Sequence, residues 1–203
     1  MNNVVEVREI SGRIMSMKLA SATGGLTFFS VYAPPADHPL KEKEAFYDDL
    51  TREINAAEGI YYVGGDFNAR IYERLEHEKE VIGTHLIKRA DYITTQEKGK
   101  GINPNTRENR DLSIDFLKKH ELVAHNTMFE KPQNKLVTYK EKVPEHNPSS
   151  EKYQGENAGP YDFAKYAQCD YLVSPQKWGA TVLDCESWID LHRDSDHIPI
   201  HAK

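Results

Sequence analysis

Cysteine is scarce in this chain of 203 residues, and long hydrophobic runs are absent from it. The two cysteines, Cys169 and Cys185, allow at most one bridge, and their number and spacing match neither a disulfide framework nor a zinc site. The apolar run at 59–65 is far too short to cross a bilayer about 30 Å thick. The first residues also lack the basic and apolar segments of an export signal. We therefore expect an intracellular protein of the cytoplasm or nucleus, not secreted and with no membrane partner, whose thiols are reduced.

An excess of basic residues is also absent. The chain has 26 Lys and Arg against 32 Asp and Glu, which gives a formal net charge of -6. It therefore lacks the overall positive charge of a protein that binds nucleic acid by charge alone, and any such binding must be local or assisted by a metal cation. With 38% hydrophobic and 29% charged residues the composition indicates a folded protein. We expect one domain over 1–203 with a polar surface insertion at 143–160.

The spacing of apolar residues predicts a mixed α/β chain. Strands are expected over 4–7, 13–19 and 26–32, the last two as a hairpin. An amphipathic helix is expected over 40–57, and a strand covered on both faces over 60–63. The order strand, helix, buried strand predicts a layered α/β fold. Further along the chain we expect a long loop over 84–108 with a short helix near 84–92, a helix over 110–120, and short strands over 122–124, 136–139, 169–173, 181–186 and 198–201.

Polar side chains stand at the ends of several predicted strands, where α/β proteins usually build their sites. Taken alone, each also fits a structural role as a turn former, a strand aromatic or a strand-end cap. Together they match the needs of phosphodiester hydrolysis, which uses carboxylates for a hard cation such as Mg²⁺, a base for water, and donors to phosphate oxygens. An aspartate beside the histidine would fix its tautomer and raise its pKa. These residues are Tyr32, Asp66, Asn68, Asp170, Asp196 and His197.

Five short motifs follow one another in a fixed order: VYAPP at Val31–Pro35, GGDFNA at Gly64–Ala69, NTMF at Asn126–Phe129, DY at Asp170-Tyr171 and SDHIP at Ser195–Pro199. This order resembles the endonuclease/exonuclease/phosphatase superfamily, which includes DNase I, apurinic/apyrimidinic endonucleases and inositol polyphosphate 5-phosphatases. The likeness is greatest to the endonuclease domain of non-LTR (LINE-type) retrotransposons.

The resemblance implies a fold and an activity. The fold would be the DNase I-like arrangement of four layers, a two-sheet β-sandwich flanked by helices. The activity would be Mg²⁺-dependent hydrolysis of phosphodiesters that nicks DNA, with Mn²⁺ as a substitute cation. The partners implied are DNA and a reverse transcriptase domain of the same polyprotein.

The resemblance also implies roles for the residues around the attacking water and the metal. Asp66 would orient or deprotonate the water. Asn68 would hold that water or a phosphate oxygen. Asp196 would be the metal ligand.

Three further residues would act on the phosphate. Tyr32 would contact the phosphate or the leaving oxygen. Asp170 would hold the ring of His197, and His197 would donate a hydrogen bond to the scissile phosphate.

Two motifs of the family are not found here. In the family, an Asn near the start of the domain and a metal-binding Glu, usually preceded by Gln, lie upstream of the VYAPP strand. The hairpin strands fill the 30 residues before Val31, and neither Glu6 nor Glu9 follows a glutamine, so we expect both glutamates to face solvent. The resemblance therefore implies a partial domain without its N-terminal strands, in which metal binding and catalysis are weakened.

Two alternatives remain open at this point. One is a catalytically inactive remnant of the domain that at most binds DNA or a protein partner. The other is a phosphoinositide phosphatase of the same fold, because such enzymes share the GDFN and SDH elements. A group of basic residues can either contact DNA phosphates or form an ordinary solvated face: Lys98, Lys100, Arg107, Arg110, Lys118 and Lys119.

Overall fold

Three antiparallel strands begin the fold, as the alternating apolar pattern predicts. In the computed structural model, β1 (Val4–Ser11) pairs with β2 (Ile14–Ser21), and β2 pairs with β3 (Gly24–Tyr32). The expected hairpin is therefore confirmed. The residues described are 3–21, 24–87, 104–140, 166–188, 191 and 195–203.

A helix then carries the chain from β3 to a parallel neighbour. Helix α1 (Leu40–Ala56) buries Phe46, Leu50 and Ile54, which recur every four residues and so form one face. The following strand β4 (Ile60–Asp66) pairs in parallel with β3. This crossover confirms the predicted order of strand, helix and buried strand, although β4 extends beyond residue 63 to Asp66.

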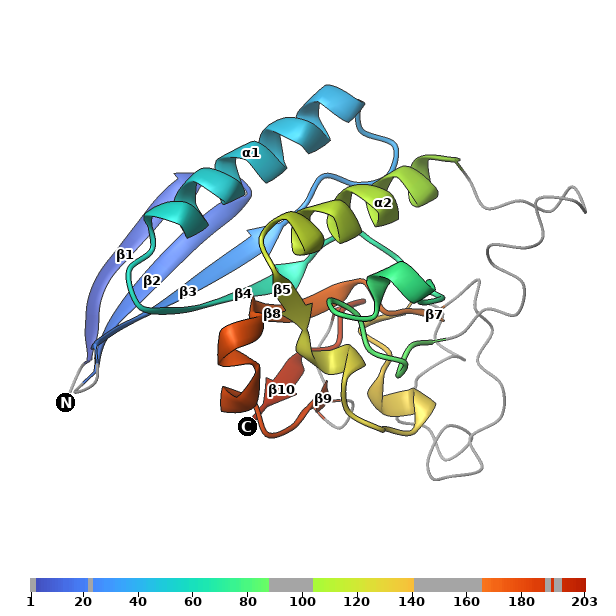
Figure 1. Ribbon diagram of the computed structural model, residues 1–203. Helices are drawn as coiled ribbons and strands as arrows, with labels where there is room; N and C mark the ends of the chain where they lie inside the picture. The colour runs from blue at the N-terminus through green and yellow to red at the C-terminus, as the bar shows by residue number, and fades with distance from the viewer. Residues whose placement is uncertain (1–2, 22–23, 88–103, 141–165, 189–190, 192–194) are drawn as a thin grey trace, which may run out of the picture.

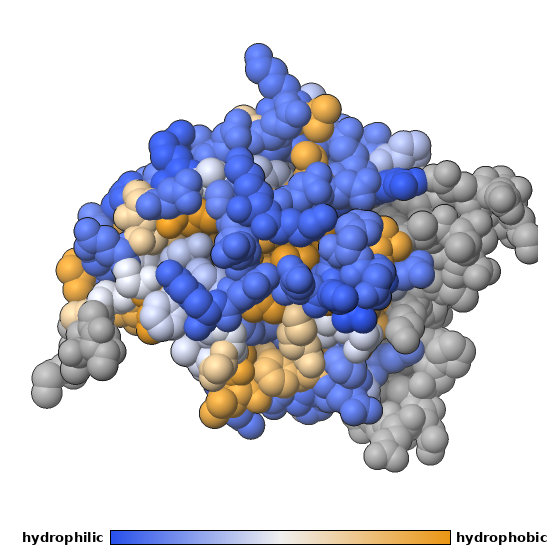
Figure 2. Space-filling view, viewed as in Figure 1, coloured by the Kyte–Doolittle hydropathy of each residue, from blue (hydrophilic) through white to orange (hydrophobic). Residues whose placement is uncertain are grey.

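The central sheet has six strands in the order β1-β2-β3-β4-β8-β5. Its last two members are β8 (Asp170–Pro175) and β5 (Leu122–Ala124), and β8 is antiparallel to both of its neighbours. Helices α1 and α2 (Pro104–Lys119) lie on one side of this sheet (Figure 1). Where these helices face the viewer, the surface is mostly hydrophilic (Figure 2). The main core therefore lies between the helices and the sheet.

Smaller elements complete the described part of the chain. Strand β9 (Cys185–Ser187) pairs with β10 (Ile200–Ala202), and β6 (Tyr139–Lys140) pairs with β7 (Tyr166–Ala167). The β9–β10 pair lies on the side of the central sheet opposite to the helices (Figure 1). The large sheet, the smaller sheets and the outer helices agree with the expected fold class. Four short 3-10 helices lie within the described residues: η1 (Glu76–Glu78), η3 (His125–Thr127), η4 (Gln133–Lys135) and η7 (Gln176–Thr181).

The second helix begins earlier than its sequence predicts. The expectation of a loop over 84–108 is wrong for 104–108, because α2 starts at Pro104. Proline fits the first turn of a helix, where its missing N–H has no acceptor inside the helix. The first turns are also held by Glu108, whose carboxylate accepts a 2.7 Å bond from the buried ammonium of Lys43. Residues 84–87 are not helical, and 88–103 lie outside the described residues.

Two short strands are displaced from their predicted positions. At 136–138 the chain closes the η4 turn, with the N–H of Leu136 donating to the carbonyl of Gln133, so β6 begins only at Tyr139. At 181–184 the chain leaves η7, and β9 begins at Cys185. Local turn bonds therefore take up the N–H groups of Leu136 and Val182, whereas Thr138 and Leu183 donate to Ala167 and Lys203 outside the assigned strands. The polar insertion predicted over 143–160 lies outside the described residues.

The two N-terminal glutamates lie where the sequence predicts. Glu6 and Glu9 are exposed on β1, which is the edge strand of the central sheet. No helix among the described residues is long and apolar enough to span a membrane.

Candidate active site

The register of three adjacent strands aligns the first group of site residues. Tyr32 at the end of β3 is the direct partner of Asp66 at the end of β4. Asp66 is in turn the partner of Asp170 at the start of β8. Directly opposite residues point to the same face of a sheet, and the neighbours Val31 and Val63 point into the core beneath the helices. The three polar side chains therefore emerge together on the face away from the helices.

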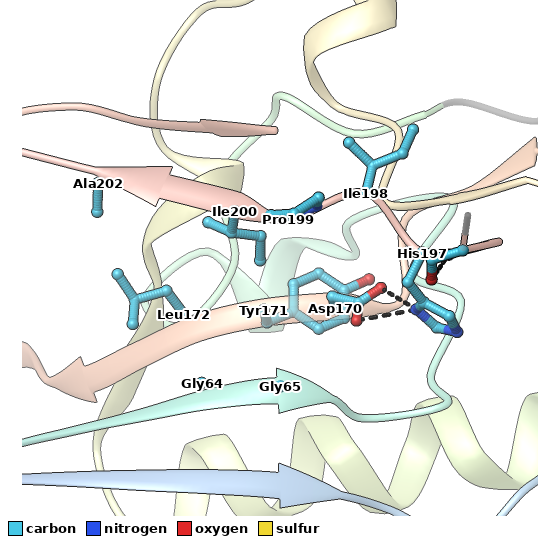
Figure 3. Close-up of a pocket in the computed structure, with 11 residues that line it drawn as sticks. Gly64, Gly65, Asp170, Tyr171, Leu172, His197, Ile198, Pro199, Ile200 and Ala202 are labelled. Atoms are coloured by element: carbon cyan, nitrogen blue, oxygen red, sulfur yellow. Dashed lines mark hydrogen bonds and ion pairs between the residues drawn. The ribbon is translucent and has the colours of Figure 1, made fainter. Parts of the chain in front are cut away.

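His197 reaches the same place from the C-terminal segment. An isolated bridge pairs it with Tyr139, and the N–H of Ile198 donates to the carbonyl of Thr138 at 2.8 Å. Its Nδ1 lies 3.0 and 3.1 Å from the two carboxylate oxygens of Asp170 (Figure 3). Its Nε2 lies 3.8 Å from Oδ2 of Asp66. The imidazole thus stands between two carboxylates and hydrogen bonds to one of them.

The carboxyl group of Asp66 is buried, and its acidity is altered accordingly. Burial and, to a lesser extent, the nearby charge of Asp170 raise the pKa of Asp66 to about 6, against a bond from the N–H of Asn68 that lowers it. A carboxylate with such a pKa is ionised at neutral pH and is a better proton acceptor than an ordinary aspartate.

The pKa of His197 is also raised, which for an imidazole favours the charged form. The hydrogen bond to Asp170 raises the pKa of His197 to about 9, partly opposed by burial, and the charges of Asp66 and Asp196 add to the rise. The ring is therefore an imidazolium at neutral pH, with Nδ1–H on Asp170 and Nε2–H directed to the region of Asp66. The Nε2–H donor of His197 and the carboxylate acceptor of Asp66 therefore face the same small volume.

The remaining predicted residues lie around this pair. The backbone of Asn68 is left-handed, with φ of 48°, and its side-chain amide donates to the carbonyl of Ala33 at 2.7 Å. Tyr32 is 48% exposed, and the guanidinium of Arg13 lies 5.3 Å from the centre of its ring. Asp196 precedes His197 and is partly buried. The strands bring Tyr32, Asp66 and Asp170 together, and Asn68 also has a structural contact that its sequence position did not reveal.

One residue inside the site was missed by sequence reasoning. Cys169 is buried, and its thiol donates to Oδ2 of Asp170 at 3.5 Å and hydrogen bonds to Asp66 as well. Burial raises the pKa of the Cys169 thiol well above its ordinary value. Its position directly before Asp170 in the sequence was the only available signal.

A second group of missed residues holds the backbone of the site. The amide of Asn109 on α2 donates to the carbonyls of Pro34 and Asn68 at 3.0 and 3.1 Å. It thereby ties the segment after β3 to the segment after β4. Nothing in the sequence around Asn109 indicates this contact, because its partners are about 40 and 75 residues away.

The NTMF motif has a comparable structural role. The amide of Asn126 donates to the carbonyl of Asp170 at 3.0 Å, and its oxygen accepts the N–H of Leu172 at 3.4 Å. The hydroxyl oxygen of Thr138 accepts the N–H groups of Cys169 and Asp170, both at 3.0 Å. These contacts fix the start of β8 and so the direction of the Asp170 side chain.

The basic residues suggested as DNA contacts divide into two kinds. Arg110 is buried, with Nη2 2.7 Å from Oε2 of Glu78 and 2.8 Å from the carbonyl of Glu73. Arg110 therefore forms a buried structural ion pair and is not exposed for contact with DNA. Arg107, Lys118 and Lys119 are exposed on α2, whereas Lys98 and Lys100 lie outside the described residues.

The donor set is suited to a divalent cation. Asp66 and Asp170 are direct partners across the strand pair, and the charge of Asp170 raises the pKa of Asp66. Asp196 adds a third carboxyl group next to His197. Carboxylate oxygens are the ligands that Mg²⁺ prefers, and a cation would relieve the repulsion among them. The residues present therefore fit a metal of this class.

Comparison with known proteins connects this geometry to a fold. No model of a protein family matches the chain. Among solved structures it is similar to the 3′ phosphatase NExo from Neisseria bound to product DNA hairpin, with a TM-score of 0.55, 14% identity, and coverage of 98% of this chain and 70% of that one. This chain has the DNase I-like fold.

Two further structures share this DNase I-like fold. One is the endonuclease domain of TRAS1, a telomere-specific non-LTR retrotransposon, with a TM-score of 0.56, 13% identity, and coverage of 97% of this chain and 64% of that one. The other is the AP endonuclease LMAP from Leishmania major, with a TM-score of 0.58, 14% identity, and coverage of 95% and 54%. These proteins are members of the endonuclease/exonuclease/phosphatase superfamily, which confirms the fold that the five motifs imply.

Two curated relatives match the whole sequence. Both are named craniofacial development protein 2, one from Tragulus javanicus and one from Bos taurus, and each is 24% identical over 204 residues. The match covers 100% of this chain but only 29% and 28% of the relatives. The DNase I-like chain thus spans less than a third of the length of the curated relatives it matches.

Proposed function

We propose that this chain is a metal-dependent phosphodiester hydrolase that nicks DNA, of the type found in non-LTR retrotransposons. The observation that carries the proposal is the triad of Asp66, His197 and Asp170, in which a buried carboxylate and a histidine held by a second carboxylate face one small volume. One DNase I-like neighbour is bound to a product DNA hairpin and another is named an AP endonuclease, which supports DNA as the substrate.

The chemistry follows from the two shifted groups. Asp66, ionised at neutral pH, accepts a proton from the attacking water. The imidazolium of His197 donates through Nε2 to a phosphate oxygen as negative charge grows on it, while Asp170 keeps the ring in place through Nδ1. The 3.8 Å between Nε2 and Oδ2 of Asp66 leaves these two atoms without a direct hydrogen bond, so both remain available to a substrate.

Three other residues complete the proposed site. Tyr32 extends the same row toward solvent and supplies a phenol to the phosphate or the leaving oxygen. Asn68 holds the water or a phosphate oxygen with the part of its amide that is not bonded to Ala33. Asp196 would hold Mg²⁺, or Mn²⁺ in its place, and the cation when bound offsets charge on the phosphate.

The alternative of a catalytically inactive remnant has one observation in its favour. Glu6 and Glu9 are exposed on the edge strand β1, so neither supplies a carboxylate to the site. Loss of a charged ligand would loosen the cation, and the reaction depends on its accurate placement. The same experiment decides between the two functions.

The deciding experiment measures nicking of supercoiled plasmid by the purified chain with Mg²⁺, with Mn²⁺ and with EDTA. We expect nicking that EDTA abolishes and that Asp66→Asn reduces by at least about a hundredfold, because the variant lacks the proton acceptor. Asp115→Asn, at an exposed aspartate on α2, is the matched control and should nick like the wild type.

Two results would contradict the proposal. If folded wild-type chain does not nick with either cation, the chain is an inactive remnant. If Asp66→Asn nicks as fast as Asp115→Asn, the activity comes from another group or from a contaminating nuclease. Release of phosphate from phosphoinositides in place of nicking would favour the phosphatase alternative.

A further inference from the structure

Two residues of the proposed site and a buried cysteine bring three side chains of different chemistry together. Sγ of Cys169, a carboxylate oxygen of Asp170 and a ring nitrogen of His197 all lie within 4.8 Å of one another. Thiol, carboxyl and imidazole together form a ligand set typical of zinc and not of magnesium, since a thiolate selects soft or borderline metals. The sequence hides this set, because 28 positions separate Cys169 from His197.

Two of the three pairs of ligand atoms are separated by distances close to the edges of a tetrahedral zinc site. Bond lengths of about 2.0 Å to nitrogen and oxygen and about 2.3 Å to sulfur place tetrahedral N···O and S···O pairs roughly 3.3 and 3.5 Å apart. Here Nδ1 of His197 is 3.0 and 3.1 Å from the carboxylate oxygens of Asp170. Sγ of Cys169 is 3.5 Å from Oδ2 of the same residue. The third pair, Sγ of Cys169 and the ring nitrogen of His197, lies within 4.8 Å, so these two side chains must move closer to each other to bind one ion.

An entry path and a fixed frame are also present. A cavity of about 410 Å³ between β8 and β10 is lined by Asp170 and His197 (Figure 3). The backbone of Cys169 and Asp170 is held by the hydroxyl of Thr138. A metal that arrives through this cavity meets Asp170 and His197 directly, with the buried thiol of Cys169 next to Asp170. Ligands that are already positioned reduce the cost of ordering them.

We propose that Cys169, Asp170 and His197 form a site for a thiophilic divalent cation of the zinc class, and that its occupation switches the nuclease site off. Binding releases the protons on Sγ and on Nδ1, and the ion takes the place of the hydrogen bond between His197 and Asp170. His197 then no longer has the Asp170 contact that holds it for the phosphate. The metal site stands on the geometry alone, whereas the inhibition rests on the proposed function.

The other cysteine provides a matched control. Cys185 is also buried and free, and it lies between Asp184 and Glu186. Both carboxylates are taken up by Lys131, with contacts of 2.7 and 2.9 Å. Both carboxylates already have the ammonium of Lys131 as a partner. Among the described residues, Cys185 is therefore not part of a comparable group of metal ligands.

The test uses Co²⁺ as a spectroscopic probe for zinc on the full chain. We expect one equivalent of Co²⁺ to give a near-ultraviolet band of thiolate-to-cobalt charge transfer, with visible bands typical of a four-coordinate ion. Zn²⁺ should displace it. Cys169→Ala should lose the charge-transfer band, and Cys185→Ala should keep it. Absence of the band in folded wild-type protein, or its loss in Cys185→Ala with retention in Cys169→Ala, overturns the proposal.

Nicking measures the inhibitory part separately. In the presence of Mg²⁺, Zn²⁺ should inhibit the wild type and Cys185→Ala equally, and inhibition of Cys169→Ala should require at least about tenfold more zinc. Inhibition that is the same in all three proteins, despite a Cys169-dependent cobalt band, overturns the switch. If the wild type shows the cobalt band but does not nick, the proposed function has failed while the metal site stands.

Discussion

At the scale of single residues, the bond between Asp170 and His197 determines the charge of the candidate site. The carboxylate of Asp170 stabilises the imidazolium at 3.0 Å, and this is the largest reason why the pKa of His197 rises to about 9. An amide at this position keeps the shape of the side chain but carries no charge. We therefore expect Asp170→Asn to lower the pKa of His197 toward its ordinary value of 6.5.

NMR titration of the histidine ring signals in metal-free protein measures this shift directly. Asp115→Asn removes an exposed carboxylate of α2 and is the control. A pKa of His197 that is unchanged in Asp170→Asn would show that the pair does not set the charge of the ring. The same variant should nick DNA at least about a hundredfold more slowly, because a positioned acid or base contributes a factor of this size.

The sequence predicts the chemically active side chains better than the residues that position them. Asp66, Asp170 and His197 lie together because they end or begin elements with recognisable patterns. Asn109 and Thr138 act on backbone groups of distant segments, so their roles depend on tertiary contacts that no local pattern carries. Cys169 was assigned as an ordinary reduced thiol, since only the folded chain places it against two carboxylates.

At the scale of elements, the junction of β3 and β4 places the site and imposes a requirement for glycine. Gly65 has φ of 147°, and a Cβ at this position would lie 2.0 Å from the carbonyl oxygen of Val31. The backbone of β3 cannot yield without breaking its pairing with β4. We expect Gly65→Ala to destabilise the fold by about 3 kcal/mol or more, in the range of the severe single substitutions.

The adjacent glycine is a stringent control. A Cβ at Gly64 would meet only Cδ1 of Leu172 at 3.6 Å, an ordinary contact. Gly64→Ala should therefore unfold in urea close to the wild-type midpoint, while the midpoint of Gly65→Ala should fall clearly. Equal midpoints for the two variants would show that the close approach of β3 and β4 at Asp66 is not a constraint.

Element boundaries were the least predictable part of the fold. The three N-terminal strands, α1 and β5 follow from apolar periodicity, and the structure confirms them. The start of α2 and the positions of β6 and β9 do not follow from apolar periodicity, because they depend on individual hydrogen bonds. Lys43 reaches Glu108 from α1, and local turn bonds take up the N–H groups of Leu136 and Val182.

At the scale of the whole molecule, the central sheet separates stability from function. Helices α1 and α2 lie on one side of the sheet and the β9–β10 pair on the other (Figure 1). Core side chains such as Val31 and Val63 point toward the helices, and the aligned site residues of β3, β4 and β8 point away from them. Folding can be followed separately at a buried group that makes no hydrogen bond with Asp66, Asp170 or His197. His125 is such a group, because the residue is 2% exposed and its Nε2 lies 2.8 Å from the hydroxyl oxygen of Ser174.

Burial lowers the pKa of His125 to about 4 from an ordinary value of 6.5. Between these values the unfolded chain binds a proton at this residue and the folded chain does not. The free energy of unfolding therefore falls as the pH drops from 6.5 toward 4, and it is insensitive to this residue above 6.5. The slope contributed by one such group is at most about 1.4 kcal/mol per pH unit.

We expect His125→Gln to remove this part of the pH dependence. Urea unfolding between pH 7 and pH 5 should show a shallower loss of stability in the variant than in the wild type, even though the variant starts from a lower stability. His77→Gln, which removes an exposed histidine after β4, corrects for the loss of a histidine as such. If both variants change the slope by the same amount, the buried ring is not the source of the acid sensitivity, and the contact with Ser174 does not hold it in the neutral form.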